Sequence, residues 1–209
     1  MIIYFKLMAA AVVLGVCAAS MPGVMAQQTT PPTVRVIDVN GDMAMLLANL
    51  SNTYGVTVGL ELDTQRYQRV AVSLQDATMT DVMNAIAQSS KKYQWSQTGG
   101  VVDFWPLAGS NPLLEARISS FNVKDRSPSD TLDQLFNLPE VQAKMTELHL
   151  KRRAPEGARE KFSGSTFSLN LEGVTLREAL SKIAQESHLG FWIFRNYPNG
   201  YISISSIEK

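Results

Sequence analysis

One segment of this chain is written twice, and the duplication constrains the fold more than any other feature. Residues 70–95 recur around residues 167–192, at an offset of 97 positions, the difference between Trp192 and Trp95. The matching pairs include Leu74 and Leu171, Thr78 and Thr175, Met79 and Leu176, and Trp95 and Trp192. Each copy predicts a strand, a capped helix and a second strand. No set of catalytic residues is repeated with it, so the duplication favours a binding scaffold over an enzyme.

The N-terminus has the features of a secretory signal peptide over residues 1–26. Lys6 precedes an apolar stretch from Leu7 to Ala19, and Pro22 and Ala26 follow it. The stretch is too short to span a bilayer comfortably, and small residues before position 27 suit cleavage after Ala26. We therefore expect an exported, periplasmic chain. The alternative is lipidation of Cys17, the only cysteine; cleavage after Ala26 would leave none.

The charges of the chain give little indication of its partner. Lys and Arg number 19, Asp and Glu also number 19, and the formal net charge is zero. Neither a nucleic acid nor an anionic membrane surface is implied by that balance. We expect no integral membrane span in the mature chain.

The first copy, residues 33–107, predicts paired β-α-β halves. Its apolar residues alternate or recur at helical spacing, and its turns carry Gly or Asn. A shift of 36 positions, the difference between Val70 and Val34, aligns the two halves. We expect strands over 33–38, 56–60, 70–74 and 101–105, helices from Met43 to Gly55 and after Thr78, and a hairpin at Gly99–Gly100.

The second copy, residues 113–209, diverges in its first half. A strand over 116–123 and a helix beginning at Pro128 are expected, but the sequence at 137–140 breaks that helix, which restarts through about Leu150. The charged segment 151–161 then stands where the first copy has its second strand, and predicts a solvated loop. The match resumes from Thr166, with a hairpin over 191–205. The fold class predicted is α+β, with two tandem modules.

These strings resemble the short N-terminal domain shared by secretins and TonB-dependent receptors, here called STN-like. The resemblance rests on a strand, a small turn, a threonine-capped helix of the type TMTDVMNAIAQ or TLREALSKIAQ, an aromatic strand and a closing hairpin. It covers residues 33–107 and 166–207 well and residues 113–165 weakly. It implies small periplasmic modules that bind partner proteins and carry no catalytic residues.

The chain departs from that family pattern after its second copy. Family members usually continue into a secretin pore or an outer-membrane barrel, whereas nothing follows Lys209 in this sequence. We therefore expect a free-standing pair of modules in the cell envelope. Such a pair would be an accessory to a secretin-type secretion or pilus machine, or to TonB-linked signalling, and could associate with the outer membrane through its partner.

Candidate catalytic and metal-binding residues are few. His149 and His188 are the only histidines. Glu147 alone is a weak metal-ligand partner for His149, and His188 aligns with Lys91 at a helix end, where a structural role is favoured. Glu61 and Asp63 could flank a substrate, but such pairs usually form a solvated rim. Ser163 and Ser165 lack an accompanying base. We predict no enzyme activity, no cofactor and no metal.

The candidate partner-binding residues come from the second copy. An unguarded strand edge is expected at the hairpin 191–205, with Tyr197 and Tyr201 as anchors for an incoming strand. The basic residues Lys151, Arg152 and Arg153 offer a second docking surface, for an acidic protein or anionic headgroups. The function predicted is protein–protein interaction with an envelope partner. The alternative is a cell-wall or carbohydrate-binding protein that uses exposed aromatic residues.

Overall fold

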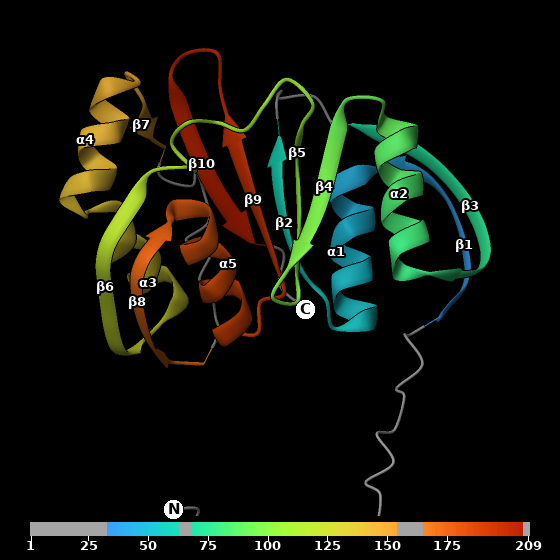
Figure 1. Ribbon diagram of the computed structural model, residues 1–209, viewed down its shortest axis with the longest axis horizontal. Coiled ribbons are helices and arrows are strands. Elements are labelled where there is room, and N and C mark those ends of the chain that lie inside the picture. Colours follow the sequence, from blue (N-terminus) through green and yellow to red (C-terminus); the bar gives the residue numbers. More distant parts are fainter. Residues whose placement is uncertain (1–32, 63–67, 154–164, 207–209) are drawn as a thin grey trace, which may run out of the picture. The chain divides into compact units, whose positions relative to one another are not determined.

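The computed structural model describes residues 33–62, 68–153 and 165–206, which belong to one compact unit (Figure 1). The signal peptide predicted for residues 1–26 lies outside these residues. The first copy contains β1 (Thr33–Asp42), α1 (Met43–Tyr54), β2 (Thr57–Leu62), β3 (Arg69–Thr78), α2 (Met79–Ser90), β4 (Tyr93–Thr98) and β5 (Val101–Pro106). The predicted α+β class and its β-α-β units are confirmed.

The second copy repeats this order with one helix divided in two. Its elements are β6 (Arg117–Arg126), α3 (Pro128–Phe136), α4 (Pro139–Glu147), β7 (Lys151–Arg152), β8 (Phe167–Thr175), α5 (Leu176–Glu186), β9 (Phe191–Asn196) and β10 (Tyr201–Ser206). The predicted break between α3 and α4 is confirmed. The prediction that a loop replaces the second strand is wrong at its start, because Lys151 and Arg152 form β7, a short counterpart of β2. Residues 154–161 lie outside the described part of the chain.

The helices α2 and α5 begin with the same capping box. The Thr78 hydroxyl accepts a hydrogen bond from the Asp81 amide, and the Asp81 carboxylate accepts one from the Thr78 amide. Thr175 and Glu178 make the same pair of bonds in α5. Each box satisfies amide groups that have no partner within the helix, so the predicted starts of both helices are confirmed.

The strands form one six-stranded sheet and two separate pairs. The order of the large sheet is β4-β5-β2-β9-β10-β7, and the pairs are β1-β3 and β6-β8. Figure 1 shows the large sheet between the two pairs. The helices α1 and α2 pack between the large sheet and β1-β3, and α5 packs against both β8 and β9.

The two copies meet where β2 and β9 pair in parallel, from Val58 opposite Phe191 to Leu62 opposite Arg195. The strands β4-β5-β2 of the first copy are followed by their counterparts β9-β10-β7 in the same order. Since β4 is antiparallel to β5 whereas β9 is parallel to β2, the second copy runs in the opposite direction. The second copy is related to the first by a half-turn about an axis across the strands, combined with a shift along that axis. The half-turn also turns the second copy over, so that corresponding faces of the two copies lie on opposite sides of the sheet.

Strand β9 contributes to both hydrophobic cores because its side chains alternate between the two faces. Phe191 and Ile193 pack with the first copy, whereas Trp192 and Phe194 pack with the second. Trp192 is buried, but its counterpart Trp95 is only half-buried. The copies are therefore joined by a shared strand: the first core includes side chains of the second copy, whereas the second core consists of residues of its own copy.

Candidate functional site

The five predicted partner-binding residues converge at the β7 end of the sheet. Lys151 lies opposite Tyr201 in the parallel pairing of β7 with β10, and Arg152 lies opposite Ile202. The Arg153 guanidinium lies 5.9 Å from the centre of the Tyr197 ring. Residues separated by about fifty positions in the sequence thus form one surface, here called the β7–β10 edge.

Three residues at the β7–β10 edge, Arg152, Arg153 and Tyr197, already have partners within the chain. Arg152 forms an ion pair of 2.7 Å with Asp133 and lies 4.8 Å above the Phe136 ring. The Tyr197 hydroxyl is 3.2 Å from the Ser203 hydroxyl. Lys151 is exposed, and Tyr201, at 37 % exposure, is the most exposed aromatic side chain in the described part of the chain. An external partner would therefore meet Tyr201 and Lys151 first.

The expectation that the last hairpin has open edges is wrong for most of its length. One side of β9 is occupied by β2, because the hairpin lies inside the large sheet and not at its end. One side of β10 is occupied by β7, but only at Tyr201 and Ile202. Within the described residues, Ser203 to Ser206 have no strand neighbour on that side. An incoming strand could extend the sheet there.

The two histidines lie at helix ends and do not approach a metal-binding cluster. His149 and His188 are both exposed, with φ of 53° and 57°. His188 takes the left-handed backbone of its counterpart Lys91, for which φ is 55°. No group of three or more His, Cys, Asp or Glu side chains suited to a metal ion occurs in residues 33–62, 68–153 and 165–206.

The expectation that Glu61 belongs to a solvated rim is wrong. Glu61 is 4 % exposed, and its carboxylate lies 2.7 Å from the Arg177 guanidinium of the second copy. It also accepts hydrogen bonds from the Asn111 amide, at 2.6 Å, and the Ser110 hydroxyl, at 3.1 Å. Burial raises the pKa of Glu61, while these bonds and Arg177 oppose that effect. Asp63 and Ser163 lie outside the described residues, and Ser165 is exposed.

Arg177 is the centre of a charged cluster between the two copies. Besides Glu61, it lies 3.5 Å from Glu115 and 3.9 Å from Asp103. The centre of the Trp105 ring, in the first copy, lies 5.7 Å from the guanidinium carbon of Arg177. The centre of the Trp192 ring, in the second copy, lies 6.0 Å from the same carbon. A guanidinium so enclosed links the first copy to the second, and we call this set the Arg177 cluster.

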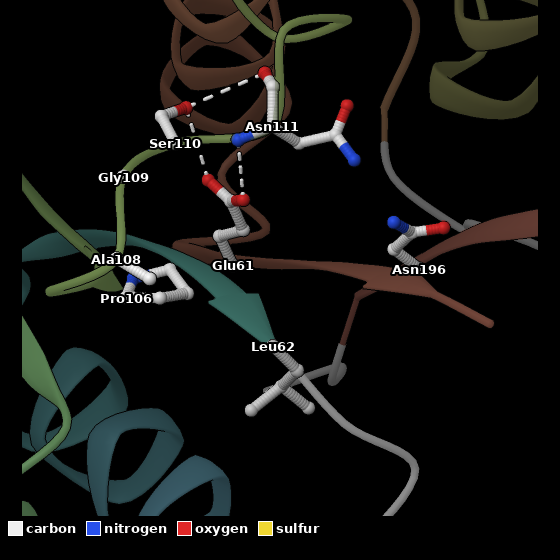
Figure 2. A pocket seen from close by; sticks show the side chains of 8 residues that line it. All are labelled: Glu61, Leu62, Pro106, Ala108, Gly109, Ser110, Asn111 and Asn196. Atoms are coloured by element: carbon white, nitrogen blue, oxygen red, sulfur yellow. Dashed lines mark hydrogen bonds between the residues drawn. The ribbon is translucent and has the colours of Figure 1, made fainter. Parts of the chain in front are cut away.

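A small cavity of about 150 Å³ adjoins Glu61. It lies where the parallel strands β5, β2 and β9 end, and is lined by Glu61, Leu62, Pro106, Ala108, Gly109, Ser110, Asn111 and Asn196. Figure 2 shows the Glu61 side chain directed toward Ser110 and Asn111, to which it is hydrogen-bonded. Ligand pockets are typically about 300–1,000 Å³, so this cavity is small for a sugar ring with its contacts.

Sequence reasoning missed the Arg177 cluster because its members are far apart in the chain. Arg177 occupies the second residue of a capped helix, where its counterpart in the first copy is Thr80. That difference between the copies is the feature of the sequence that could have indicated the Arg177 cluster. A charged residue at one copy's helix start, absent from the other, is consistent with a contact that only one copy makes.

Comparison with protein-family models and with curated proteins finds no match for this chain. Within the described residues, no helix has both the length and the apolar character needed to cross a membrane. The function must therefore be argued from the geometry of the chain itself.

Proposed function

We propose that this protein is an exported, periplasmic interaction module that binds an extended segment of an envelope protein at the β7–β10 edge. The single observation that supports this most is the short length of β7. Its counterpart β2 spans Thr57–Leu62, whereas β7 spans only Lys151–Arg152. Beyond Ile202, the described part of the chain supplies no strand beside β10, and a partner strand would find main-chain donors and acceptors there.

The joining of the two copies supports the same mode of binding. The β2 edge accepts β9 through parallel main-chain pairing, and the apolar side chains of β9 complete the neighbouring core. A module of this type therefore binds a strand at the outer edge of its β2-type strand. Strand β7 is the β2-type strand of the second copy, and it lies beside exposed Tyr201 and Lys151. An accessory role in a secretin-type or TonB-linked machine remains the pathway we propose, on the resemblance of the sequence.

The carbohydrate-binding alternative has weaker support. Sugar binding of the kind considered needs exposed aromatic faces, but Phe104, Phe191, Trp192 and Phe194 are buried in the cores. Trp95 stacks on Phe104 and donates to Asn84. Tyr201 is left as a single exposed ring in the described residues, which suits a protein contact better than a sugar-stacking platform.

Site-specific photocrosslinking tests the proposal. A photoreactive residue at position 201, in cells that export the chain, should give one discrete protein adduct, whereas position 182 on the exposed side of α5 should not. Tyr201→Ala should weaken capture by about 5- to 150-fold if Tyr201 is a binding hot spot worth about 1–3 kcal/mol. Leu107→Ala is the matched control, because Leu107 is exposed and apolar but directly follows β5, which is separated from β10 by β2 and β9 in the sheet. Equal capture by Tyr201→Ala would exclude this edge, and retention on peptidoglycan or polysaccharide without a protein adduct would favour the alternative.

A further inference from the structure

The Arg177 cluster contains more acidic groups than basic ones. Glu61 of β2, Asp103 of β5 and Glu115 of the segment before β6 face a single guanidinium, and Glu178 follows Arg177 in α5. Glu61 has the closest contact, at 2.7 Å, and Glu115 is about half exposed, at 54 % for its side chain. Asp103 is the third carboxyl group; it is largely buried, with 15 % of its side chain exposed, and poorly paired.

The surroundings of Asp103 leave its charge largely uncompensated. One carboxyl oxygen, Oδ1, is buried and accepts no hydrogen bond from the described residues, and its distance from Arg177 Nη1 is 3.9 Å. That Nη1 is itself buried and donates to no described group. The Oδ1 atom packs against Gly59, where an added Cβ would lie 2.3 Å from it, beside the ring of Trp192. The carboxyl group thus touches the strand β2 at the point where β2 pairs with β9.

We propose that Asp103 makes the junction between the two copies proton-dependent: a proton on its carboxyl group tightens the β2–β9 pairing, and loss of that proton loosens it. In the ionised state the junction holds a largely buried negative charge beside Glu61, Glu115 and Glu178, and Arg177 is the one cation of the described residues that pairs with this group. In the protonated state that excess charge is removed, and Arg177 remains paired with Glu61. Buried charge without a full partner is costly, so the neutral junction is the more stable one.

The titration of Asp103 agrees with this geometry. Burial raises the pKa of Asp103 from 3.8 to about 6, with Arg177 opposing the shift and Glu115 and Glu178 adding to it. A folded-state pKa above the unfolded value means that the folded junction binds the proton more strongly. Its stabilising effect is complete below pH 3.8 and is lost as the pH rises through about 6. Glu61 shifts in the same direction.

Hydrogen exchange of the exported, full-length chain tests this proposal. After correction for the chemical exchange rate, opening of the β2 and β9 amides should increase about tenfold from about pH 5 to about pH 7.5, as expected if opening returns the Asp103 pKa from about 6 to 3.8. The β4–β5 turn should not show this increase. In Asp103→Asn, which cannot ionise, the pH dependence of β2 and β9 should fall, and any remainder is that of Glu61. Glu115→Gln, at the exposed carboxylate of the same cluster, is the matched control and should retain it.

Two outcomes would overturn the proposal. Equal pH dependence in the native chain and in Asp103→Asn would mean that another group controls the junction, and a uniform increase at all protected amides would mean that the whole fold responds. Should Asp103→Asn not fold, side-chain carboxyl NMR of the native protein decides instead. Titration of Asp103 near pH 6 would support the proposal, and titration near 3.8 would contradict it.

Discussion

The Trp192 indole packs directly against the backbone of Gly59, so that a Cβ at position 59 would lie 2.4 Å from Cζ2 of Trp192. Trp192 belongs to the second copy and Gly59 to the first, on the paired strands β9 and β2. A side chain at position 59 would have to displace a buried ring. The two copies can therefore pair closely at this point because residue 59 is a glycine and has no side chain.

Gly59→Val should destabilise the protein by about 1–3 kcal/mol, the usual cost of adding side-chain volume to a packed core. The added atoms would collide with Trp192 and with Asp103, neither of which is the free end of a flexible chain. Urea unfolding measures the change. Ala71→Val on the exposed face of β3 is the control and should remain within about 0.5 kcal/mol of the native protein. An unaffected Gly59→Val protein would mean that the junction is looser than the structure indicates.

Arg177→Met should cost about 3–5 kcal/mol, because it leaves the buried Glu61 carboxylate and the largely buried Asp103 carboxylate without their cation. Glu61→Gln in the same chain should recover part of the lost stability, since it removes one of the two carboxylates that have no cation after the first substitution. A double-mutant cycle by chemical denaturation gives the coupling energy of the pair. Arg117→Met is the matched control at an exposed arginine of β6. Strictly additive effects of the two substitutions would contradict a direct Arg177–Glu61 interaction.

The elements of this fold follow from local signals, whereas the joining of the copies does not. Capping boxes at Thr78 and Thr175 and the turn at Gly99–Gly100 act over a few residues, so the sequence predicts them well. The pairing of β2 with β9 joins residues more than a hundred positions apart, and no local pattern encodes it. One signal was present: Phe191 to Phe194 is an uninterrupted apolar run, as a strand covered on both faces requires. The corresponding strand β4, at the end of the sheet, carries Ser96 and Gln97 instead.

Thr78→Ala and Thr175→Ala should each cost about 1 kcal/mol, because each removes the hydroxyl that caps a helix. Similar losses are expected in α2 and α5, since the two boxes have the same geometry. Thr80→Ala, within the first turn of α2, is the control and should have little effect. Thermal unfolding measures all three. A loss confined to one helix would show that the two copies do not depend equally on their caps.

The α2 cap should weaken in acid. The Thr78 hydroxyl, and then its amide, hold the pKa of Asp81 below its ordinary value of 3.8. A lowered pKa means that the contribution is present above pH 3.8 and is lost as the pH falls through the lower, folded-state value. This direction is opposite to that of Asp103. Asp81→Asn should reduce the loss of stability on acidification, measured by unfolding at several pH values. The same loss of stability in acid in Asp81→Asn and in the native protein would contradict this role of Asp81.

The exported chain should begin at Gln27, because Ala26 and the residues before it suit a signal peptidase. Intact-mass measurement on protein recovered from the periplasm decides this. Cys17→Ser should be processed identically, as Cys17 would be removed with the leader. A lipid attached to Cys17 would contradict the prediction and would place the chain on a membrane surface.

The shared strand β9 leads to a prediction about the two halves as separate chains. Residues 33–107 contain every element of the first copy, so the sequence favours independent folding, but Phe191 and Ile193 of the second copy complete its core. We expect residues 33–107 alone to melt at a lower temperature than the full chain, and the addition of residues 108–209 to restore the difference through β2–β9 pairing. Ile193→Ser in the second piece copies the Ser96 of β4 and should prevent the restoration, because it removes a buried side chain from the first core. Thermal melts and size-exclusion chromatography of the pieces, separate and mixed, provide the measurement. Identical melting of residues 33–107 with and without the second piece would show that the first copy is complete by itself and that β9 only adheres to it.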